Sequence, residues 1–136
     1  MMLPGDAFGN KRVHEARCGS QHSCVITELD GDLYCFGYNN VYELGLGDPY
    51  ISHVTSPRLV PLFDTLNLKT LSVTPTGSSS NLGFFSCSVA TSEGSSQSNS
   101  VSCWGRETDG MFTARVSVVL YTPPLMIYRI SFMYII

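Results

Sequence analysis

The sequence is poor in charged residues and in the residues that favour α-helices. Charged side chains make up 14% of its 136 residues, against roughly 25% in an average soluble protein. It contains four Ala, two Lys, five Glu and two Gln, whereas helical bundles and coiled coils are rich in these residues and in Leu. The composition therefore argues against a helical fold, and the length predicts about one domain.

Positive charge is scarce as well. The chain has eight Lys and Arg, a formal net charge of −3 and a pI of about 5.4, and Lys11-Arg12 is its one basic cluster. A surface that binds nucleic acid needs a stripe of basic residues to neutralise phosphates. We therefore expect this segment to bind no nucleic acid.

The residues that are abundant favour β-structure with polar loops. Hydrophobic residues make up 43% of the chain, which also holds 28 Ser and Thr, 12 Gly and 7 Pro. β-Branched and aromatic runs bounded by turn residues are typical of strands. They predict strands over residues 13–17, 23–27, 33–37, 66–73, 81–90 and 101–105. Residues 38–58 are expected to form a long loop, followed by a short apolar edge at 58–63.

Two of the predicted hairpins carry the same pattern. Ser23-Cys24-Val25-Ile26, a turn with Gly and then Leu33–Gly37 form the first copy. Ser86-Cys87-Ser88-Val89, a longer Ser-rich loop and then Val101–Gly105 form the second copy. Each copy reads Ser-Cys-x-[Val/Ile], turn, apolar-x-Cys-aromatic-Gly. A hairpin pattern that occurs twice in one chain predicts stacked or radial β repeats.

The first copy resembles the regulator of chromosome condensation repeat family, whose blades form a β-propeller. Cys18–Ser23 is similar to the Gly-x-x-His-[Ser/Thr] turn of that family. Asp30–Tyr34 is similar to its Asp-Gly-x-[Val/Leu]-[Tyr/Trp] hairpin, and Phe36–Gly47 to its Trp-Gly-x-Asn and Gln-Leu-Gly-x-Gly stretch. The first copy departs from the family at Phe36 for Trp, Tyr42 for Gly and Glu43 for Gln.

The resemblance implies an all-β fold of about two four-stranded propeller blades, expected to be a fragment of a longer ring. Residues 13–63 are expected to form the first repeat and 64–112 a degenerate second one, with Phe85 where the family has His. Residues 1–12 are expected to end a preceding repeat or to lack structure. The repeat positions with an implied structural role are Gly19, His22, Gly31, Gly37, Asn39, Leu44, Gly45, Gly47, Trp104 and Gly105.

Four of the five cysteines flank the two hairpins, Cys24 with Cys35 and Cys87 with Cys103. If the first turn is symmetric about the midpoint of its pair, the two cysteines lie directly opposite each other and can form a disulfide. If Asp30-Gly31 forms a two-residue turn, the pair is out of register by two. The sequence leaves both registers open.

The redox state of these cysteines would indicate the compartment in which the protein works. Bridged pairs imply an oxidising or extracellular environment, whereas reduced cysteines act as small buried hydrophobic residues in an intracellular protein. Cys18 has no partner in the pattern. Disulfides at both pairs are the favoured interpretation, and the localisation stays unknown.

A metal and a cofactor are both disfavoured. His14, Cys18, His22 and Cys24 offer zinc ligands, but zinc sites usually contain a C-x2–4-C pair that this spacing lacks. Gly45–Asp48 is similar to part of a dinucleotide fingerprint, but a Pro follows it directly and no strong helical pattern comes next. We expect neither a metal nor a cofactor.

No catalytic residue is expected either. His22 is a candidate by residue type, but the resemblance implies that it is a structural residue that organises the blade. An enzyme would need His22 or His53 to face a cysteine or a carboxylate across a pocket. The chain is therefore predicted not to be an enzyme.

The last residues are apolar. Residues 116–136 approach the length of a membrane span, but they contain Pro123-Pro124 and Arg129. A buried strand or a truncated, non-native tail is the favoured interpretation of residues 113–136, and a transmembrane helix is the alternative.

The resemblance implies a non-enzymatic scaffold that binds a protein partner. Rigid strands would present loops such as Tyr38–Thr55 and Thr91–Ser100. Some members of the family are guanine-nucleotide exchange factors, so a part in exchange or signalling is a finer implication. The alternative is a small disulfide-bridged extracellular binding module.

Overall fold

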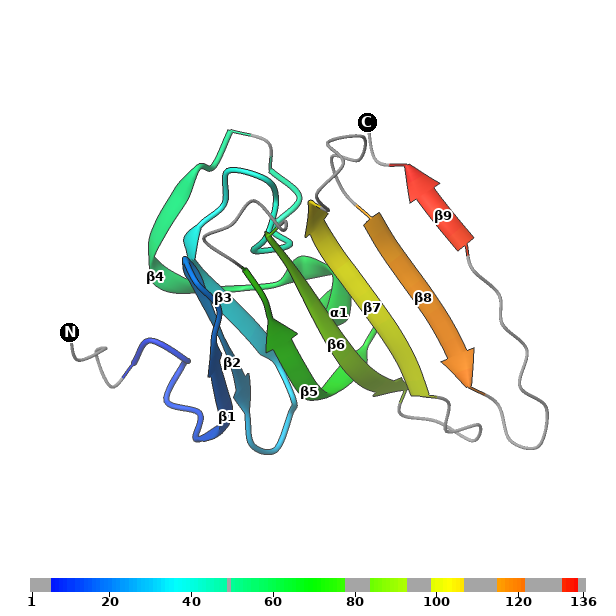
Figure 1. Ribbon diagram of the computed structural model, residues 1–136. Coiled ribbons are helices and arrows are strands. Elements are labelled where there is room, and N and C mark those ends of the chain that lie inside the picture. The colour runs from blue at the N-terminus through cyan, green and yellow to red at the C-terminus, as the bar shows by residue number, and fades with distance from the viewer. Residues whose placement is uncertain are drawn as a thin grey trace.

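The computed structural model describes residues 6–48, 50–77, 84–92, 99–106, 115–121 and 131–134. In this part the chain is almost entirely β, with two antiparallel sheets and one short helix (Figure 1). The first sheet comprises β1 (Val13–Cys18), β2 (His22–Thr27), β3 (Leu33–Tyr38) and β4 (His53–Leu59). The second comprises β5 (Leu68–Pro75), β6 (Phe84–Ser92), β7 (Asn99–Arg106), β8 (Arg115–Tyr121) and β9 (Ser131–Tyr134). The helix is α1 (Pro61–Thr65).

Both sheets are meanders, in which strands that follow each other in sequence lie next to each other. This order is that of propeller blades, as the sequence predicted. The first sheet has four strands, the number that the resemblance implied for a blade. The second has five, because β8 and β9 fall in the apolar tail and extend it. Within the part of the chain that is described, no helix has the length and hydropathy needed to cross a membrane.

The hairpin between β2 and β3 decides between the two registers that the sequence left open. Ile26 pairs with Leu33 and Cys24 with Cys35, so the turn is symmetric about the midpoint of the cysteines. The Thr27 amide donates to the carbonyl of Asp32 at 3.0 Å and closes a loop longer than two residues. The two cysteines therefore lie directly opposite each other.

The sequence interpretation of residues 38–58 as one loop was wrong at its end, where β4 forms. This strand lies at the edge of the sheet and pairs with β3 across an irregularity between Cys35 and Gly37. Pro57 falls in that irregular stretch, between the paired residues Val54 and Arg58. A proline has no amide to donate and is confined to edges and bulges, so it lowered the strand signal without preventing the strand.

Residues 58–63 form the end of β4 and the start of α1, and not simply an extended edge. Pro61 opens the helix, where its missing amide hydrogen has no helical acceptor in any case. The helix places Phe63 in the core, where its ring lies 5.6 Å from that of Trp104 in an edge-to-face arrangement. The helix thus fills space between the two sheets (Figure 1).

The two sheets share one hydrophobic core. In β6 the residues Ser86, Ser88 and Ala90 are buried, whereas Cys87 and Val89 alternate with them and are half-buried. Because alternate residues of a strand point to opposite faces, the small residues of the second sheet form its face toward the first sheet. The buried core residues are Cys24, Ile26, Leu33, Cys35, Leu44, Val54, Val60, Phe63, Val73, Ala90 and Trp104.

Candidate protein-contact site

The loop that joins β3 to β4, residues 39–52, is held at both ends by one buried side chain. The Asn39 side-chain amide donates to the carbonyl of Ile51 at 2.7 Å, and its oxygen accepts from the Leu44 amide at 3.0 Å. The Asn39 backbone amide donates to Ser52 at 2.8 Å. We call this segment the β3–β4 loop, and these bonds give its backbone a defined shape.

Two further residues anchor the loop from within. Glu43 is buried, and its carboxylate accepts from the Val41 amide at 2.8 Å. Leu44 is fully buried in the core shared by the sheets. The sequence marked Glu43 only as a departure from the family, and the structure shows that its side chain satisfies a backbone amide of the loop.

Tyr42 has a backbone conformation that is rare for a tyrosine. Its φ is +65°, in the left-handed region that favours glycine. Gly is usual at this position in the family that the first copy resembles, and glycine adopts this conformation without the strain that a tyrosine has in it. Such strain costs of order 1–3 kcal/mol and persists where surrounding contacts fix the backbone. Here the contacts are those of Asn39 and Glu43 on either side.

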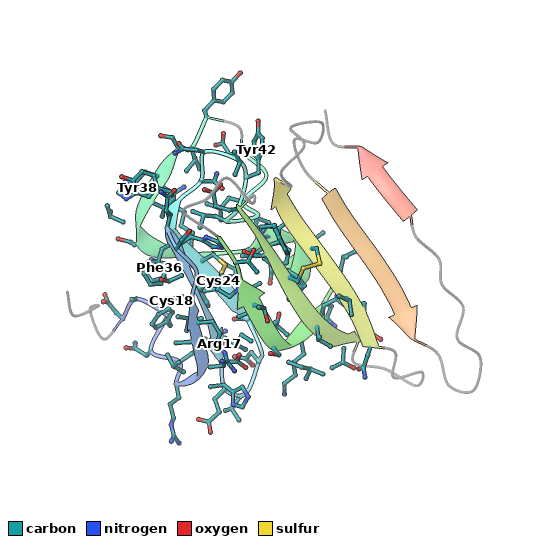
Figure 2. The ribbon with its side chains drawn as sticks, in the orientation of Figure 1. Arg17, Cys18, Cys24, Phe36, Tyr38 and Tyr42 are labelled. Atoms are coloured by element: carbon teal, nitrogen blue, oxygen red, sulfur yellow. A yellow bond between two sulfur atoms is a disulfide. The ribbon has the colours of Figure 1, made fainter. Side chains whose placement is uncertain are left out.

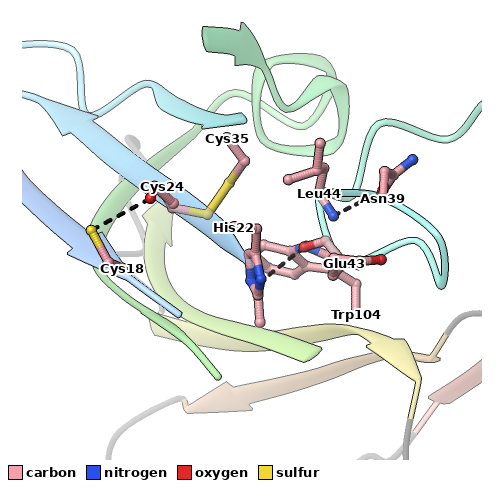
Figure 3. Close-up of a disulfide and its surroundings, with 10 residues drawn as sticks. Cys18, His22, Cys24, Cys35, Asn39, Glu43, Leu44 and Trp104 are labelled. Carbon is pink, nitrogen blue, oxygen red and sulfur yellow. Dashed lines mark hydrogen bonds between the residues drawn. A yellow bond between two sulfur atoms is a disulfide. The ribbon is translucent and has the colours of Figure 1, made fainter. Parts of the chain in front are cut away.

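The second sheet also holds the loop, through a buried hydrogen-bonded group that we call the inter-sheet cluster: His22, Glu43, Ser86 and Trp104. Figure 3 shows His22, Glu43 and Trp104 of this cluster. The Glu43 carbonyl accepts from the Trp104 indole at 2.9 Å and from the Ser86 hydroxyl at 3.0 Å. A Cβ on Gly45 would lie 2.8 Å from the indole nitrogen. A glycine at this position therefore lets the loop lie directly against Trp104.

The hydrogen bonds of the cluster fix the state of His22. A serine hydroxyl has one proton, and Ser86 donates it to the Glu43 carbonyl. His22 Nε2 lies 2.7 Å from Ser86 Oγ and must therefore be the donor. His22 is 2% exposed, and burial lowers its pKa to about 4. The ring is thus neutral at pH 7, and its Nδ1 has no partner among the described residues.

The direction of the hydrogen bond between His22 and Ser86 is the reverse of that in a catalytic serine–histidine pair. In a serine nucleophile the hydroxyl donates its proton to the histidine, whereas Ser86 accepts a hydrogen bond from His22 and is fully buried. His53, the other histidine considered for catalysis, is exposed, and its ring lies tilted against that of Tyr38 with centroids 5.1 Å apart. The geometry of His22 suits the joining of two sheets.

The opposite end of the contact between the sheets is held by backbone. The Gly31 carbonyl accepts from the Thr70 amide at 2.8 Å, and a Cβ on Gly31 would lie 2.3 Å from Lys69 Cγ and 3.0 Å from Thr70 backbone atoms. Within the first sheet, at the end that carries His22, Gly37 has a φ of +114° and leaves no room for a Cβ beside the Gln21 carbonyl. Close backbone approach explains the glycine at both positions.

An ion-pair cluster supports the same end of the first sheet. Lys11 Nζ lies 2.5 Å from Asp32 and 3.0 Å from Asp30, in the turn between β2 and β3. Hydrogen bonds to Asp32 and Asp30 raise the pKa of Lys11. The cluster ties the segment before β1 to the hairpin and is largely solvated, so its contribution to stability is small.

Both cysteine pairs are joined by disulfides, each between directly opposed residues. Cys24–Cys35 is fully buried in the shared core, with Cα atoms 4.2 Å apart. Cys87–Cys103 has Cα atoms 4.1 Å apart and is half-buried on the other face of the second sheet. Cys18 is free and exposed, and its sulfur accepts a hydrogen bond from Ser23 at 3.4 Å.

The outer side of the β3–β4 loop presents aromatic side chains to solvent. Tyr50 is 93% exposed and Tyr38 is 47% exposed, while Tyr42 is half-buried. Tyr38 and Tyr42 both lie at the end of the first sheet from which the loop projects (Figure 2). We use the name tyrosine face for Tyr38, Tyr42, Tyr50 and His53, which lie in the β3–β4 loop or directly at its two ends. The sequence predicted protein contact for this loop but did not mark these side chains.

The other glycines that the sequence predicted as repeat positions lie in turns, strands or the β3–β4 loop. Gly19 donates to the His22 carbonyl at 2.8 Å, and Gly105 lies opposite Phe85 in the second sheet. Gly47 is exposed in the loop. Gly45 and Gly47 precede a strand and not a helix, so the backbone of a dinucleotide site does not form there.

In the described ranges no group of three or more His, Cys, Asp or Glu could hold a metal ion. Most of the second predicted contact loop, Thr91–Ser100, lies outside the described residues.

Comparison with known proteins identifies the repeats. Two forms of the regulator of chromosome condensation (RCC1) repeat match the sequence, one over residues 14–43 and the other over residues 30–74. Among solved structures, human WBSCR16 has a similar fold, with a TM-score of 0.51 at 16% sequence identity. The match covers 88% of this chain and 37% of that chain, so this chain spans well under half of the relative's length.

Proposed function

Since residues 14–74 of this chain are regulator of chromosome condensation repeats, we propose that it is a protein-binding scaffold and that its β3–β4 loop makes the contact. Such repeats build β-propeller scaffolds. One observation carries the choice of this loop: it is rigidly anchored by Asn39, Glu43 and Trp104, and it exposes Tyr50 almost completely. Tyrosine is enriched at binding hot spots because it offers a large contact area at a low cost in conformational entropy.

The three basic residues between residues 6 and 17 support a protein partner over a nucleic acid. Lys11, Arg12 and Arg17 each form an ion pair with a carboxylate of the chain. Cations that are already paired are poorly placed to neutralise phosphates. Guanine-nucleotide exchange stays outside the proposal, because the geometry of the described residues offers no feature specific to it.

The proposal can be tested with a photo-crosslinking residue placed at position 50 or at position 29. Leu29 is a matched control, because it is 84% exposed and lies in the turn at the opposite end of the first sheet. We expect a discrete protein to crosslink from position 50 and not from position 29. With that protein purified, replacing both Tyr38 and Tyr50 by Ala should weaken binding at least tenfold. Equal crosslinking from both positions, or unchanged affinity of the double variant, would refute the proposal.

The two disulfides favour a second candidate, an extracellular binding module. Reduced and oxidised samples differ in mass after thiol alkylation, so the number of bridges is measurable directly. Two intact bridges in protein from its native source, with Cys18 alone alkylated before reduction, would support an oxidising compartment. Five free thiols would exclude it and leave the scaffold proposal standing.

A further inference from the structure

The two ends of the first sheet differ in charge. The turn between β2 and β3 gathers Lys11 with Asp30 and Asp32, while Arg12 pairs with Glu28 nearby. At the other end the sequence has no Lys or Arg from residue 18 to residue 57. The tyrosine face thus lies at an end of the sheet to which the intervening strands and loop bring no cation.

A carboxylate is built into this face. Asp48 is half-buried, and its side chain accepts from the Tyr50 backbone amide at 2.9 Å. This bond fixes a negative group beside the most exposed tyrosine of the described residues. Arg17, at the end of β1, does not offset that charge, because it lies 2.6 Å from Glu15 and is paired with it.

Among the described residues of the β3–β4 loop no aliphatic side chain is exposed, and Val41, Leu46 and Ile51 are half-buried. The exposed large aliphatic residues of the described part lie elsewhere, at Val13, Leu29, Leu66 and Leu71. An apolar helix or strand would be matched by aliphatic contacts as well as aromatic rings. Exposed aromatic rings beside a carboxylate instead match a cation, which is attracted to the face of the ring and to the negative charge.

From this placement we propose that the tyrosine face binds a cationic segment of the partner protein, in which Arg or Lys side chains stack on Tyr38 and Tyr50 and pair with Asp48. This inference rests on the proposed function and specifies the chemistry of the partner. Arginine fits best, because its planar guanidinium stacks on an aromatic ring and can still donate hydrogen bonds to a carboxylate.

An unbiased selection tests the inference without knowledge of the partner. A random peptide library is displayed and selected on the full chain, and individual peptides are then measured against purified variants. We expect the selected peptides to be rich in Arg and Lys and to bind more weakly as salt is raised. Affinity should fall at least tenfold for Tyr38→Ala/Tyr50→Ala and about threefold for Asp48→Asn. Tyr50→Phe should keep most of the affinity, and Leu29→Ala should keep all of it.

The outcomes separate the two levels of the proposal. Peptides that depend on Tyr38 and Tyr50 but show no excess of Arg or Lys would overturn the cationic partner and leave the contact site intact. Peptides whose binding is unaffected by the tyrosine variants would overturn both. Circular dichroism and the Tyr50→Phe variant distinguish a lost contact from a lost fold.

Discussion

The two repeats carry the same pattern in different surroundings. In the first, Cys24–Cys35 is fully buried between the sheets, whereas the equivalent Cys87–Cys103 is half-buried on a face that points away from the first sheet. Phe36 is half-buried, but its equivalent Trp104 is buried against the β3–β4 loop. Equivalent residues of the two repeats therefore lie in different surroundings, one facing the other sheet and one facing away from it.

This difference follows from a head-to-tail arrangement of the sheets. The cysteine face of the first sheet meets the opposite face of the second, which carries Ser86, Ser88 and Trp104. Contacts of this heterologous kind join unlike surfaces. A residue can thus keep its place in the repeat while its contribution to stability depends on the neighbour that it meets.

The largest expected effect comes from the aromatic position of each repeat. Trp104→Ala removes a buried ring that contacts Phe63 and Gly45 and donates to Glu43. It should lower the free energy of unfolding by about 4 kcal/mol, within the range for large aromatic truncations in cores. Phe36→Ala should cost less than half as much, because Phe36 is only half-buried. Urea unfolding measures both, and equal costs would contradict the asymmetry.

The disulfides should differ in the same direction. Each closes a short loop, with separations of 11 and 16 residues, and loop closure of this size contributes about 3 kcal/mol. Replacing Cys24 and Cys35 together by Ala also opens a cavity in the core, so this pair should cost about 1 kcal/mol more than Cys87 and Cys103. Unfolding of the two double variants under non-reducing conditions decides. A greater loss at Cys87 and Cys103 would show that burial does not set the difference.

The second repeat has Phe85 at the position that His22 occupies in the first. Because Phe does not titrate, only the first repeat can make stability depend on pH at this position. The pKa of His22 in the fold is about 4, against about 6.5 when unfolded, so the unfolded chain binds the proton more readily between these values. Stability is full above pH 6.5 and is lost as the pH falls toward 4, by about 2 kcal/mol at pH 5. His22→Gln should remove this part of the pH dependence. An unchanged slope in the variant would mean that other groups cause it.

The smallest expected effect concerns Tyr42, which has a positive φ in the β3–β4 loop. Tyr42→Gly should raise the free energy of unfolding by about 1 kcal/mol, because glycine adopts this conformation without strain. Tyr42→Ala is the matched control, since it removes the ring and keeps the strain, and it should bring no such gain. Thermal unfolding of the two variants measures the difference. An equal gain with Ala and with Gly would locate the cost in the ring and not in the backbone conformation.

The sequence predicted much of the first repeat because its signals are local. The pattern around Cys24 and Cys35 gave the hairpin, but its register depended on the turn, and turns of two lengths fitted the residues. The strand β4 was missed because Pro57 disfavours a strand everywhere except at an edge or a bulge. Long-range pairing gives no such local signal.

The inter-sheet cluster shows the limit most clearly. His22 and Ser86 are 64 residues apart, and Glu43 meets Trp104 over a separation of 61. The sequence named His22 and Trp104 as structural positions but could not place them together. Ser86 had one usable signal, its equivalence to Ser23 in the repeat, whereas Glu43 stood out only as a departure from the family.

The central claim is that the second sheet holds the β3–β4 loop in its binding shape, and hydrogen exchange in Trp104→Phe tests it most directly. This variant keeps the ring and removes the hydrogen bond to the Glu43 carbonyl. The Leu44 amide, which donates to Asn39, should exchange at least fivefold faster than in the parent chain. The amide of Val25, in the middle of β2, should change less. Unchanged protection at Leu44, or an equal increase at both amides, would contradict the claim that Trp104 orders the loop.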